Sequence, residues 1–335
     1  MRILITDKNF AGDIDVERQA AGDGAVFDVF DDGAEVTPEA WAAAEAIVTY
    51  RCTELVTAKL DKLERCRIVV RGGVGFDGLD LARFGARGIP VCNVPDYGTT
   101  EVADHAIALM LALRRGIVGY NDGLRADPAA NWSYAGQPCV ARLRGGRFGI
   151  VGLGRIGTAA ARRARGFDME VAFHDPYLPE GVDLATGFTR VERLEELFES
   201  ADALSLHTPL STETLKLVSA DLLARMRPGA VLVNTSRGPV VDIDALYAAL
   251  QDGPIGGAAL DVLPTEPPAD HPLIRAYTGR EPWIEKRLIL TPHSAFYSEP
   301  GQRDLRRKAI ETVRGYLHGG APRNCVNRDQ LRLNA

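Results

Sequence analysis

The stretch that decides the fold is Phe148-Gly149-Ile150-Val151-Gly152-Leu153-Gly154-Arg155-Ile156-Gly157. A short apolar strand leads into glycines with the spacing GxGxxG, and a helical run begins near Arg155. The first glycine permits a tight turn, the second lets a pyrophosphate approach the backbone, and the third lets the helix pack on the strand. The helix N-terminus then favours the negative phosphates. The stretch predicts a dinucleotide site, although a glycine turn between any strand and helix has the same spacing.

A carboxylate stands where ribose recognition is expected. Asp175 follows the predicted strand Glu170–His174 and lies 18 positions after Gly157 (175 minus 157), near the spacing of about 20 at which an acid receives the ribose hydroxyls. A carboxylate repels a 2′-phosphate, and no arginine or lysine stands beside Asp175 to receive one. The pattern favours NAD over NADP, and the alternative is a turn aspartate before Pro176.

Strands and helices alternate on both sides of this motif. Helical stretches with apolar residues three and four apart separate six short apolar strands between positions 147 and 291. Parallel strands need such crossovers, so we expect a doubly wound sheet. The predicted strands are Arg147–Val151, Glu170–His174, Ala203–His207, Ala230–Asn234, Gly257–Asp261 and Leu288–Thr291. The predicted helices are Ile156–Arg165, Val191–Ser200, Ala220–Met226 and Ile243–Gln251.

The region before Asn93 predicts a second βα-repeating unit. Its strands include Arg2–Thr6, Ala46–Thr49, Arg67–Arg71 and Pro90–Asn93, and the alanine-rich Glu39–Ala46 predicts a helix. One last helix, about Gly301–Gly320, comes too late for the second sheet and suits a return to the first. We expect an α/β protein of two Rossmann-like domains: a discontinuous, flavodoxin-like substrate domain (1–99 plus 297–335), a dinucleotide domain (100–296) and an active cleft between them.

Composition restricts the function further. The 335 residues are 46% hydrophobic and carry a formal net charge of −6 without a dense basic stripe, so we expect no nucleic-acid partner. Asp104 and His105 interrupt the apolar stretch Ala103–Leu113, which predicts a buried helix rather than a membrane span. Five scattered cysteines without a CxxC pair favour neither disulfides nor a metal site. With no secretion signal at the start, we expect a cytoplasmic protein.

Three charged residues lie at or just beyond strand ends, where an open α/β sheet forms its ligand crevice. They are Arg237, Glu266 in a proline-rich loop (263–272), and His293. Hydride transfer to a keto acid needs a cation that polarises the carbonyl, an acid that protonates its oxygen, and a carboxylate that keeps this acid charged. Arg237 is the candidate cation, His293 the candidate acid and Glu266 the candidate carboxylate. Taken singly, Arg237 could be a turn cap, Glu266 a solvated loop acid and His293 a structural histidine.

At these residues the sequence resembles the D-isomer-specific 2-hydroxyacid dehydrogenase family, and the resemblance covers nearly the whole chain. NVPDYGT and HSAFYS resemble the branch related to the C-terminal binding proteins. The matching segments are RGGVGFDGLDL (71–81), NVPDYGTTEVADHA (93–106), GIVGLGRIG (149–157), HTPL (207–210), VLVNTSRGPVVD (231–242), AALDVLPTEPP (258–268) and LTPHSAFYS (290–298).

The resemblance implies an NAD-dependent oxidoreductase that interconverts 2-hydroxy and 2-keto acids at their CH–OH group. Arg237, Glu266 and His293 would form its catalytic triad, with His293 as general acid and base. It also implies a homodimer, with contacts from the cofactor domain and the segment near Leu124–Pro138, where Trp132 is a candidate anchor. The implied substrate residues are Arg71, Val74, Gly75, Tyr97 and Phe296, with Tyr297 nearby. The implied cofactor residues are Gly152, Gly154, Arg155, Ile156, Gly157, Asp175, His207, Thr208, Pro209, Thr214, Thr235, Ser236 and Asp261, the last receiving the nicotinamide carboxamide.

Two other functions share this scaffold. One is a nucleotide-sensing interaction protein like the C-terminal binding proteins, and the intact triad argues against it. The other is a phosphite dehydrogenase, which keeps the triad and has a cation near the position of Arg71. Formate enzymes generally have glutamine where Glu266 stands, which argues against formate.

Overall fold

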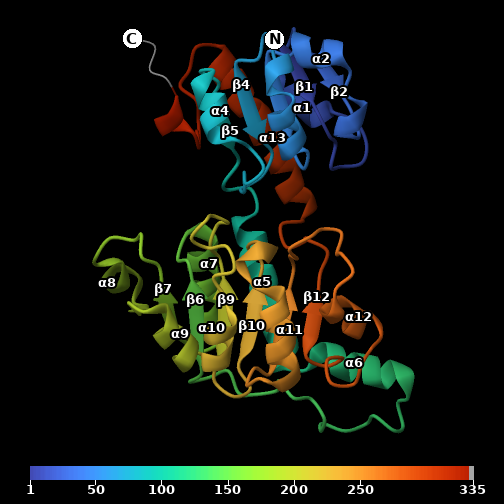
Figure 1. The fold of residues 1–335 in the computed structure, drawn as a ribbon, viewed down its shortest axis with the longest axis vertical. Helices are drawn as coiled ribbons and strands as arrows, with labels where there is room; N and C mark the ends of the chain where they lie inside the picture. Colours follow the sequence, from blue (N-terminus) through green and yellow to red (C-terminus); the bar gives the residue numbers. More distant parts are fainter. Residues whose placement is uncertain (332–335) are drawn as a thin grey trace. The chain divides into compact units, whose positions relative to one another are not determined.

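The computed structural model describes residues 1–331 and divides into two compact units, each an α/β layer structure (Figure 1). Among the described residues, unit 1 comprises Met1–Gly98 and the segment 298–331, and unit 2 is Thr99–Tyr297. Thr99 and Tyr297, which the sequence assigned to the split domain, fall in unit 2. The reason is local: Thr99 begins a long helix of that unit, and the backbone N–H of Tyr297 donates to Ser294 O at 2.9 Å.

Unit 1 has a five-stranded parallel sheet in the order β2-β1-β3-β4-β5, which is the flavodoxin-like order. Its strands are β1 (Arg2–Ile5), β2 (Val26–Val29), β3 (Ala46–Thr49), β4 (Ile68–Arg71) and β5 (Val91–Asn93). Its α-helices are α1 (Asp15–Ala21), α2 (Pro38–Ala43), α3 (Thr53–Ala58), α4 (Leu81–Ala86) and α13 (Glu299–Leu317). The expected flavodoxin-like arrangement is therefore confirmed.

Helix α13 returns to unit 1, as the sequence predicted. Its buried residues Leu305, Ala309, Ile310 and Val313 pack in one cluster with residues of the strands β1, β3 and β4. The predicted helix Glu39–Ala46 is wrong at its end, because α2 stops at Ala43 and Ala46 pairs with Ile3 in the sheet. Alanine suits both structures, and strand pairing decides the outcome here.

Unit 2 has a seven-stranded parallel sheet in the order β12-β11-β10-β9-β6-β7-β8. The strand order reverses between β6 and β9, and such a switch point opens a ligand crevice at the carboxyl ends of the strands. All six predicted strands are present, each within one residue, and β8 extends the edge. The strands are β6 (Arg147–Val151), β7 (Glu170–His174), β8 (Thr189–Arg190), β9 (Ala203–Leu206), β10 (Val231–Asn234), β11 (Gly257–Leu260) and β12 (Leu288–Leu290).

Helices cover both faces of this sheet, so its central strands are apolar on both sides. Leu232 belongs to the cluster under α9, α10 and α11, whereas its neighbours Val231 and Val233 belong to the cluster under α5 and α7. No helix among residues 1–331 has the length and apolarity that a bilayer crossing requires. The helices of unit 2 are α5 (Thr99–Arg114), α6 (Ile117–Ala126), α7 (Arg155–Arg165), α8 (Val182–Thr186), α9 (Leu194–Ser200), α10 (Ala220–Arg225), α11 (Ile243–Asp252) and α12 (Pro272–Thr278).

Candidate active site

The glycine motif forms a tight turn between β6 and α7. Gly152 has a φ of +90°, which favours glycine, and a Cβ on Gly157 would lie 2.1 Å from Gly152 O. Gly154 is the N-cap of α7 and provides no side-chain hydrogen bond to the helix, which starts with Arg155 and Ile156. The turn thus presents the uncapped N-terminus of an 11-residue helix, a place that suits an anion.

Asp175 ties the end of β7 to this turn. Its Oδ2 accepts the backbone N–H of Leu153 at 2.9 Å, and its Oδ1 accepts that of Tyr177 at 3.1 Å. A carboxylate has about four lone-pair positions, so these two bonds leave acceptor capacity for ribose hydroxyls. Tyr177 in turn donates its hydroxyl hydrogen to Glu213 in the loop after β9, which connects the loops after β7 and β9.

Two buried hydroxyls at neighbouring strand ends have no hydrogen-bond partner among residues 1–331: Thr208 Oγ1 after β9 and Thr235 Oγ1 after β10. Buried polar atoms are normally satisfied, and a ligand is one way to satisfy them. Together with the uncapped α7 N-terminus, they fit a bound dinucleotide. His207, which directly precedes Thr208, is different: Ser205 Oγ lies 2.9 Å from its Nε2, and burial lowers its pKa to about 4, so the ring is neutral at physiological pH.

The other predicted cofactor residues shape the loops after these strands. Thr214 donates its hydroxyl hydrogen to Pro209 O at 2.7 Å and accepts the N–H of Ser211 at 2.8 Å. The Ser236 hydroxyl donates to Asn234 Oδ1 at 2.8 Å. These bonds stabilise the loops internally, so Thr214 and Ser236 hold backbone shape in this structure.

The three predicted catalytic residues come together in unit 2. His293 Nδ1 lies 2.6 Å from Glu266 Oε2, and Glu266 Oε1 accepts the N–H of Leu263 at 2.9 Å. Burial alone would raise the pKa of the Glu266 carboxyl, but the hydrogen bonds from His293 and Leu263 and the charges of His293 and Arg237 hold that pKa below its usual range. Glu266 is therefore ionised at neutral pH. With Nδ1 donating to it, the imidazole has Nε2 left for a substrate.

The turn that carries Arg237 packs tightly against the Glu266 loop. A Cβ on Gly238 would lie 1.9 Å from the carbonyl carbon of Leu263, so only glycine allows this approach. Arg237 Nη1 donates to Ser236 O at 2.7 Å. The ring of Phe296, a predicted substrate residue, meets that of His293 edge to face, with centroids 6.2 Å apart.

Asp261 is buried beneath the segment that carries His293. Its Oδ1 accepts the Thr291 hydroxyl at 2.5 Å and the N–H of Ser294 at 2.9 Å, and its Oδ2 accepts the N–H of Ala295 at 3.0 Å. Most of its capacity is thus used within the protein. One position on Oδ2 is left for the predicted carboxamide, and that role stays a prediction.

The remaining predicted substrate residues belong to unit 1. Val74 and Gly75 follow the end of β4, and Val74 O accepts the side-chain N–H of Asn93 at 2.7 Å. Arg71 Nη1 donates to Gly72 O at 2.8 Å and lies across Gly73, whose added Cβ would fall 1.1 Å from it. Tyr97 packs against the apolar cluster of this unit.

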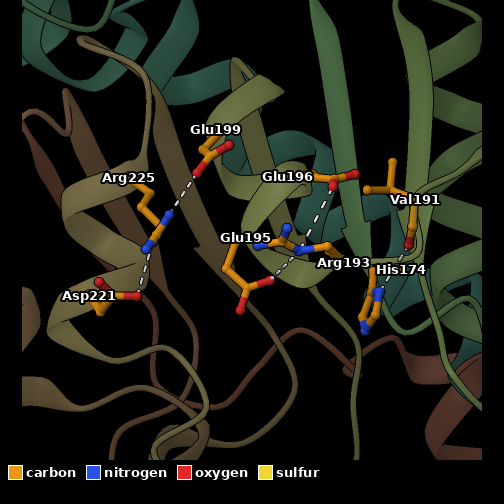
Figure 2. Close-up of polar contacts among 8 residues, drawn as sticks. All are labelled: His174, Val191, Arg193, Glu195, Glu196, Glu199, Asp221 and Arg225. Atoms are coloured by element: carbon orange, nitrogen blue, oxygen red, sulfur yellow. Dashed lines mark hydrogen bonds and ion pairs between the residues drawn. The ribbon is translucent and has the colours of Figure 1, made fainter.

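Other histidines have structural partners. His174 Nδ1 donates to Val191 O at 2.9 Å (Figure 2). The same view shows the surface ion pairs that Arg193 and Arg225 form with neighbouring glutamates. His271 Nδ1 caps α12 through the N–H of Leu273 at 3.1 Å. His105, which interrupts the apolar stretch of α5, contacts Thr291 Oγ1 through its Nε2 at 3.1 Å. Its separation of 186 residues from Thr291 is why no local pattern reveals this contact.

Comparisons with known proteins agree with this geometry. The model of the D-isomer specific 2-hydroxyacid dehydrogenase NAD binding domain matches residues 107–295. A glyoxylate reductase of Korarchaeum cryptofilum is 36% identical over 294 residues, covering 84% of this chain and 85% of that protein. Both the family model and a relative that matches over most of its length therefore support the chemistry of 2-hydroxyacid dehydrogenases.

Solved structures of similar fold bind either form of the cofactor. A D-lactate dehydrogenase of Aquifex aeolicus, complexed with NAD and lactic acid, is 27% identical with a TM-score of 0.82, covering 95% of this chain and 96% of that one. An NADPH-dependent glyoxylate/hydroxypyruvate reductase of Sinorhizobium meliloti, complexed with NADP and malonate, is 33% identical with a TM-score of 0.84, covering 100% and 99%. The chain belongs to the D-isomer specific 2-hydroxyacid dehydrogenase family, oxidoreductases that act on the CH–OH group of 2-hydroxy acids with a nicotinamide cofactor.

Proposed function

We propose that this protein is an NAD-dependent D-2-hydroxyacid dehydrogenase in which His293 is the general acid and base for a small 2-keto or 2-hydroxy acid. The observation that carries the proposal is the pair of His293 Nδ1 and Glu266 Oε2 at 2.6 Å, with the charge of Arg237 acting on the same carboxylate. A base that is oriented by a third group is the arrangement that acid–base catalysis requires.

Each residue has a distinct role in this proposal. In reduction, His293 gives the proton on Nε2 to the substrate oxygen, and in oxidation it takes that proton back. Glu266 stabilises the protonated imidazole and fixes its orientation. The Arg237 guanidinium polarises the keto group, and the backbone N–H groups of Val74 and Gly75 bind the substrate carboxylate. Arg71, Tyr97 and Phe296 select the substrate side chain.

The cofactor residues fall into three groups. The uncapped N-terminus of α7 binds the pyrophosphate, and Asp175 binds the ribose hydroxyls. The unsatisfied hydroxyls of Thr208 and Thr235 bond to the dinucleotide, and the remaining acceptor position of Asp261 takes the carboxamide. When bound, the nicotinamide donates or accepts the hydride.

NAD rather than NADP is proposed because Asp175 follows β7, accepts the N–H of Leu153 in the glycine turn, and has the spacing at which a carboxylate receives ribose hydroxyls and repels a 2′-phosphate. We expect kcat/KM for NADH to exceed that for NADPH by about 100-fold or more, the effect of roughly 3 kcal/mol of charge repulsion. Asp175→Ser should reduce the ratio while Asp183→Ser, an acid on the nearby α8, leaves it unchanged. A wild-type preference for NADPH would refute the choice of cofactor and leave the rest of the function intact.

A homodimer is proposed from exposed aromatic side chains on and after α6. Trp132 and Tyr134 are 83% and 93% exposed, and Tyr120 of α6 donates its hydroxyl hydrogen to Tyr134 O at 2.7 Å, so the two segments form one surface. Large exposed aromatic side chains that share one surface support a subunit contact there. Light scattering should give twice the chain mass, and Trp132→Ser should shift the protein toward monomer. The five unpaired cysteines favour a reducing compartment such as the cytoplasm.

The activity test is NADH oxidation with glyoxylate, pyruvate, hydroxypyruvate, phenylpyruvate and 2-ketoisocaproate, and NAD reduction with phosphite. We expect turnover of a 2-keto acid and a loss of about 10²- to 10⁴-fold in kcat for His293→Ala. His318→Ala, at an exposed position of α13's end, is the matched control and should be fully active. Turnover of phosphite alone, or cofactor binding without any turnover, would contradict the proposal.

A further inference from the structure

A polar chain runs from helix α5 to the segment that carries His293. His105 Nε2 on α5 lies 3.1 Å from Thr291 Oγ1, and that hydroxyl lies 2.5 Å from Asp261 Oδ1. His105 and Asp261 are themselves 3.6 Å apart. His105, Asp261 and Thr291 belong to unit 2, as His293 does. This series of contacts therefore connects the 16-residue helix α5 with the proposed catalytic histidine inside one compact body.

The direction of these hydrogen bonds follows from chemistry. The Thr291 hydroxyl has a single hydrogen, which it donates to Asp261 Oδ1. The Thr291 oxygen then has no hydrogen to offer His105 and must accept one. His105 Nε2 therefore carries its proton, and the order of donation is His105 to Thr291 to Asp261.

Asp261 in turn fixes the backbone around His293. His293 has a φ of +51°, a left-handed conformation that a residue with a side chain rarely adopts. Its N–H donates to Asp261 O at 2.8 Å, and the next two N–H groups, of Ser294 and Ala295, donate to the Asp261 carboxylate at 2.9 and 3.0 Å. Such a backbone persists only where surrounding contacts hold it in place. Here the three hydrogen bonds to Asp261 do so.

We propose that His105 is a positioning residue for His293, acting through Thr291 and Asp261. By donating to Thr291, His105 directs the hydroxyl hydrogen toward Asp261, and the oriented carboxylate holds the left-handed turn that keeps His293 Nδ1 on Glu266. His105 touches neither the reacting atoms nor the cofactor in this role. The inference rests on the proposed acid–base function of His293.

The test compares four variants with the wild type. His105→Leu removes the donor, and His105→Gln restores one, because the glutamine amide nitrogen reaches the place of the imidazole Nε2. Thr291→Val breaks the chain at its next link with little change in shape. Asp104→Asn is the matched control, because it removes a different polar contact of α5, the one to Arg163.

We expect kcat for keto-acid reduction to fall about tenfold or more in His105→Leu and Thr291→Val, since a small misplacement of a catalytic group has effects of this size. The KM for NADH should change less than kcat, because Thr291 contacts Asp261 Oδ1 and the position proposed for the carboxamide is on Oδ2. The alkaline limb of the kcat/KM profile should move to lower pH. His105→Gln and Asp104→Asn should resemble the wild type. The double variant of His105→Leu with Thr291→Val should be no slower than either single variant, because both break one chain.

A second readout does not depend on turnover. In protein labelled with ¹⁵N-histidine, His105 should show a slowly exchanging Nε2–H signal that Thr291→Val abolishes and Asp104→Asn leaves in place. Absence of that signal in the wild type, or wild-type kcat in a folded Thr291→Val, would overturn the inference. If His293→Ala leaves activity unchanged, the proposed function itself fails, which is a separate result. If His105→Leu does not fold, Thr291→Val carries the test alone.

Discussion

Replacing Glu266 by glutamine tests the electrostatic part of the proposed mechanism. The substitution keeps the size of the side chain and one acceptor for His293, but it removes the negative charge 2.6 Å from Nδ1. It also sets the N–H of Leu263 and that of His293 in competition for a single amide oxygen. We expect the protonated imidazole to lose stability, so the alkaline limb of kcat/KM for reduction moves to lower pH.

The size of this shift follows from the hydrogen bond that is weakened. A bond to a charged group contributes about 1.5–3 kcal/mol and a neutral one about 0.5–1.5 kcal/mol, and the lower end applies because the His293 and Glu266 side chains are 42% and 37% exposed. The difference is about 1–1.5 kcal/mol. At 1.36 kcal/mol per unit, the limb should move by about one pH unit.

The assay is the pH profile of kcat/KM from about pH 5 to 10 for the best keto acid, with Glu281→Gln, a surface acid of unit 2, as the control. An unchanged or raised limb in Glu266→Gln would refute the role given to the carboxylate. The wild type has a second expectation. Because the Glu266 pKa is depressed, the pair persists as the pH falls through the usual glutamate range and is lost only below it.

Three further predictions concern stability and backbone fit. Arg306→Met strands the buried Glu17, to which Arg306 donates at 2.6 and 2.7 Å, and should lower the free energy of unfolding by about 3–5 kcal/mol, with partial recovery in the double variant with Glu17→Gln; a loss below 1 kcal/mol in urea would contradict it. Gly238→Ala forces Cβ against the Leu263 backbone and should lower kcat at least tenfold, whereas wild-type kinetics would show that the turn adapts. Asn327→Leu removes two buried hydrogen bonds to the chain around β5, at 2.8 and 3.0 Å, and should cost about 2–5 kcal/mol, measured by thermal or urea unfolding against the wild type.

The strands were predictable because their signal is local. In unit 2 the apolar runs are buried on both faces, and each predicted strand agrees with the structure within one residue. The sequence did not predict β2 and β8. In β2, Val26 is 53% exposed, and β8 has only two residues, Thr189 and Arg190. An edge strand needs little hydrophobicity, so its sequence differs little from that of a loop.

The candidate site was predictable where strand ends and motif residues coincide, as at Glu266 and His293. The contacts that hold the site in place were not predictable, because they join residues that are far apart in the sequence. Asp261 looks in sequence like a cofactor ligand, yet it holds three donors from residues 291–295. His105 looks like a polar interruption of an apolar helix, and only the fold brings it to Thr291.

The return of α13 to unit 1 also orders the events of synthesis. The ribosome makes the strands β1 to β5 first, but Leu305 and Ile310, which cover one face of them, follow only after the 199 residues of unit 2 (99 to 297). At about 5–20 residues per second, the apolar face waits roughly 10–40 s for its last helix. Unit 2 is contiguous and is complete by then. During translation, the nascent Met1–Gly98 segment is therefore exposed for the longest time without its covering helix, and a chaperone would protect it.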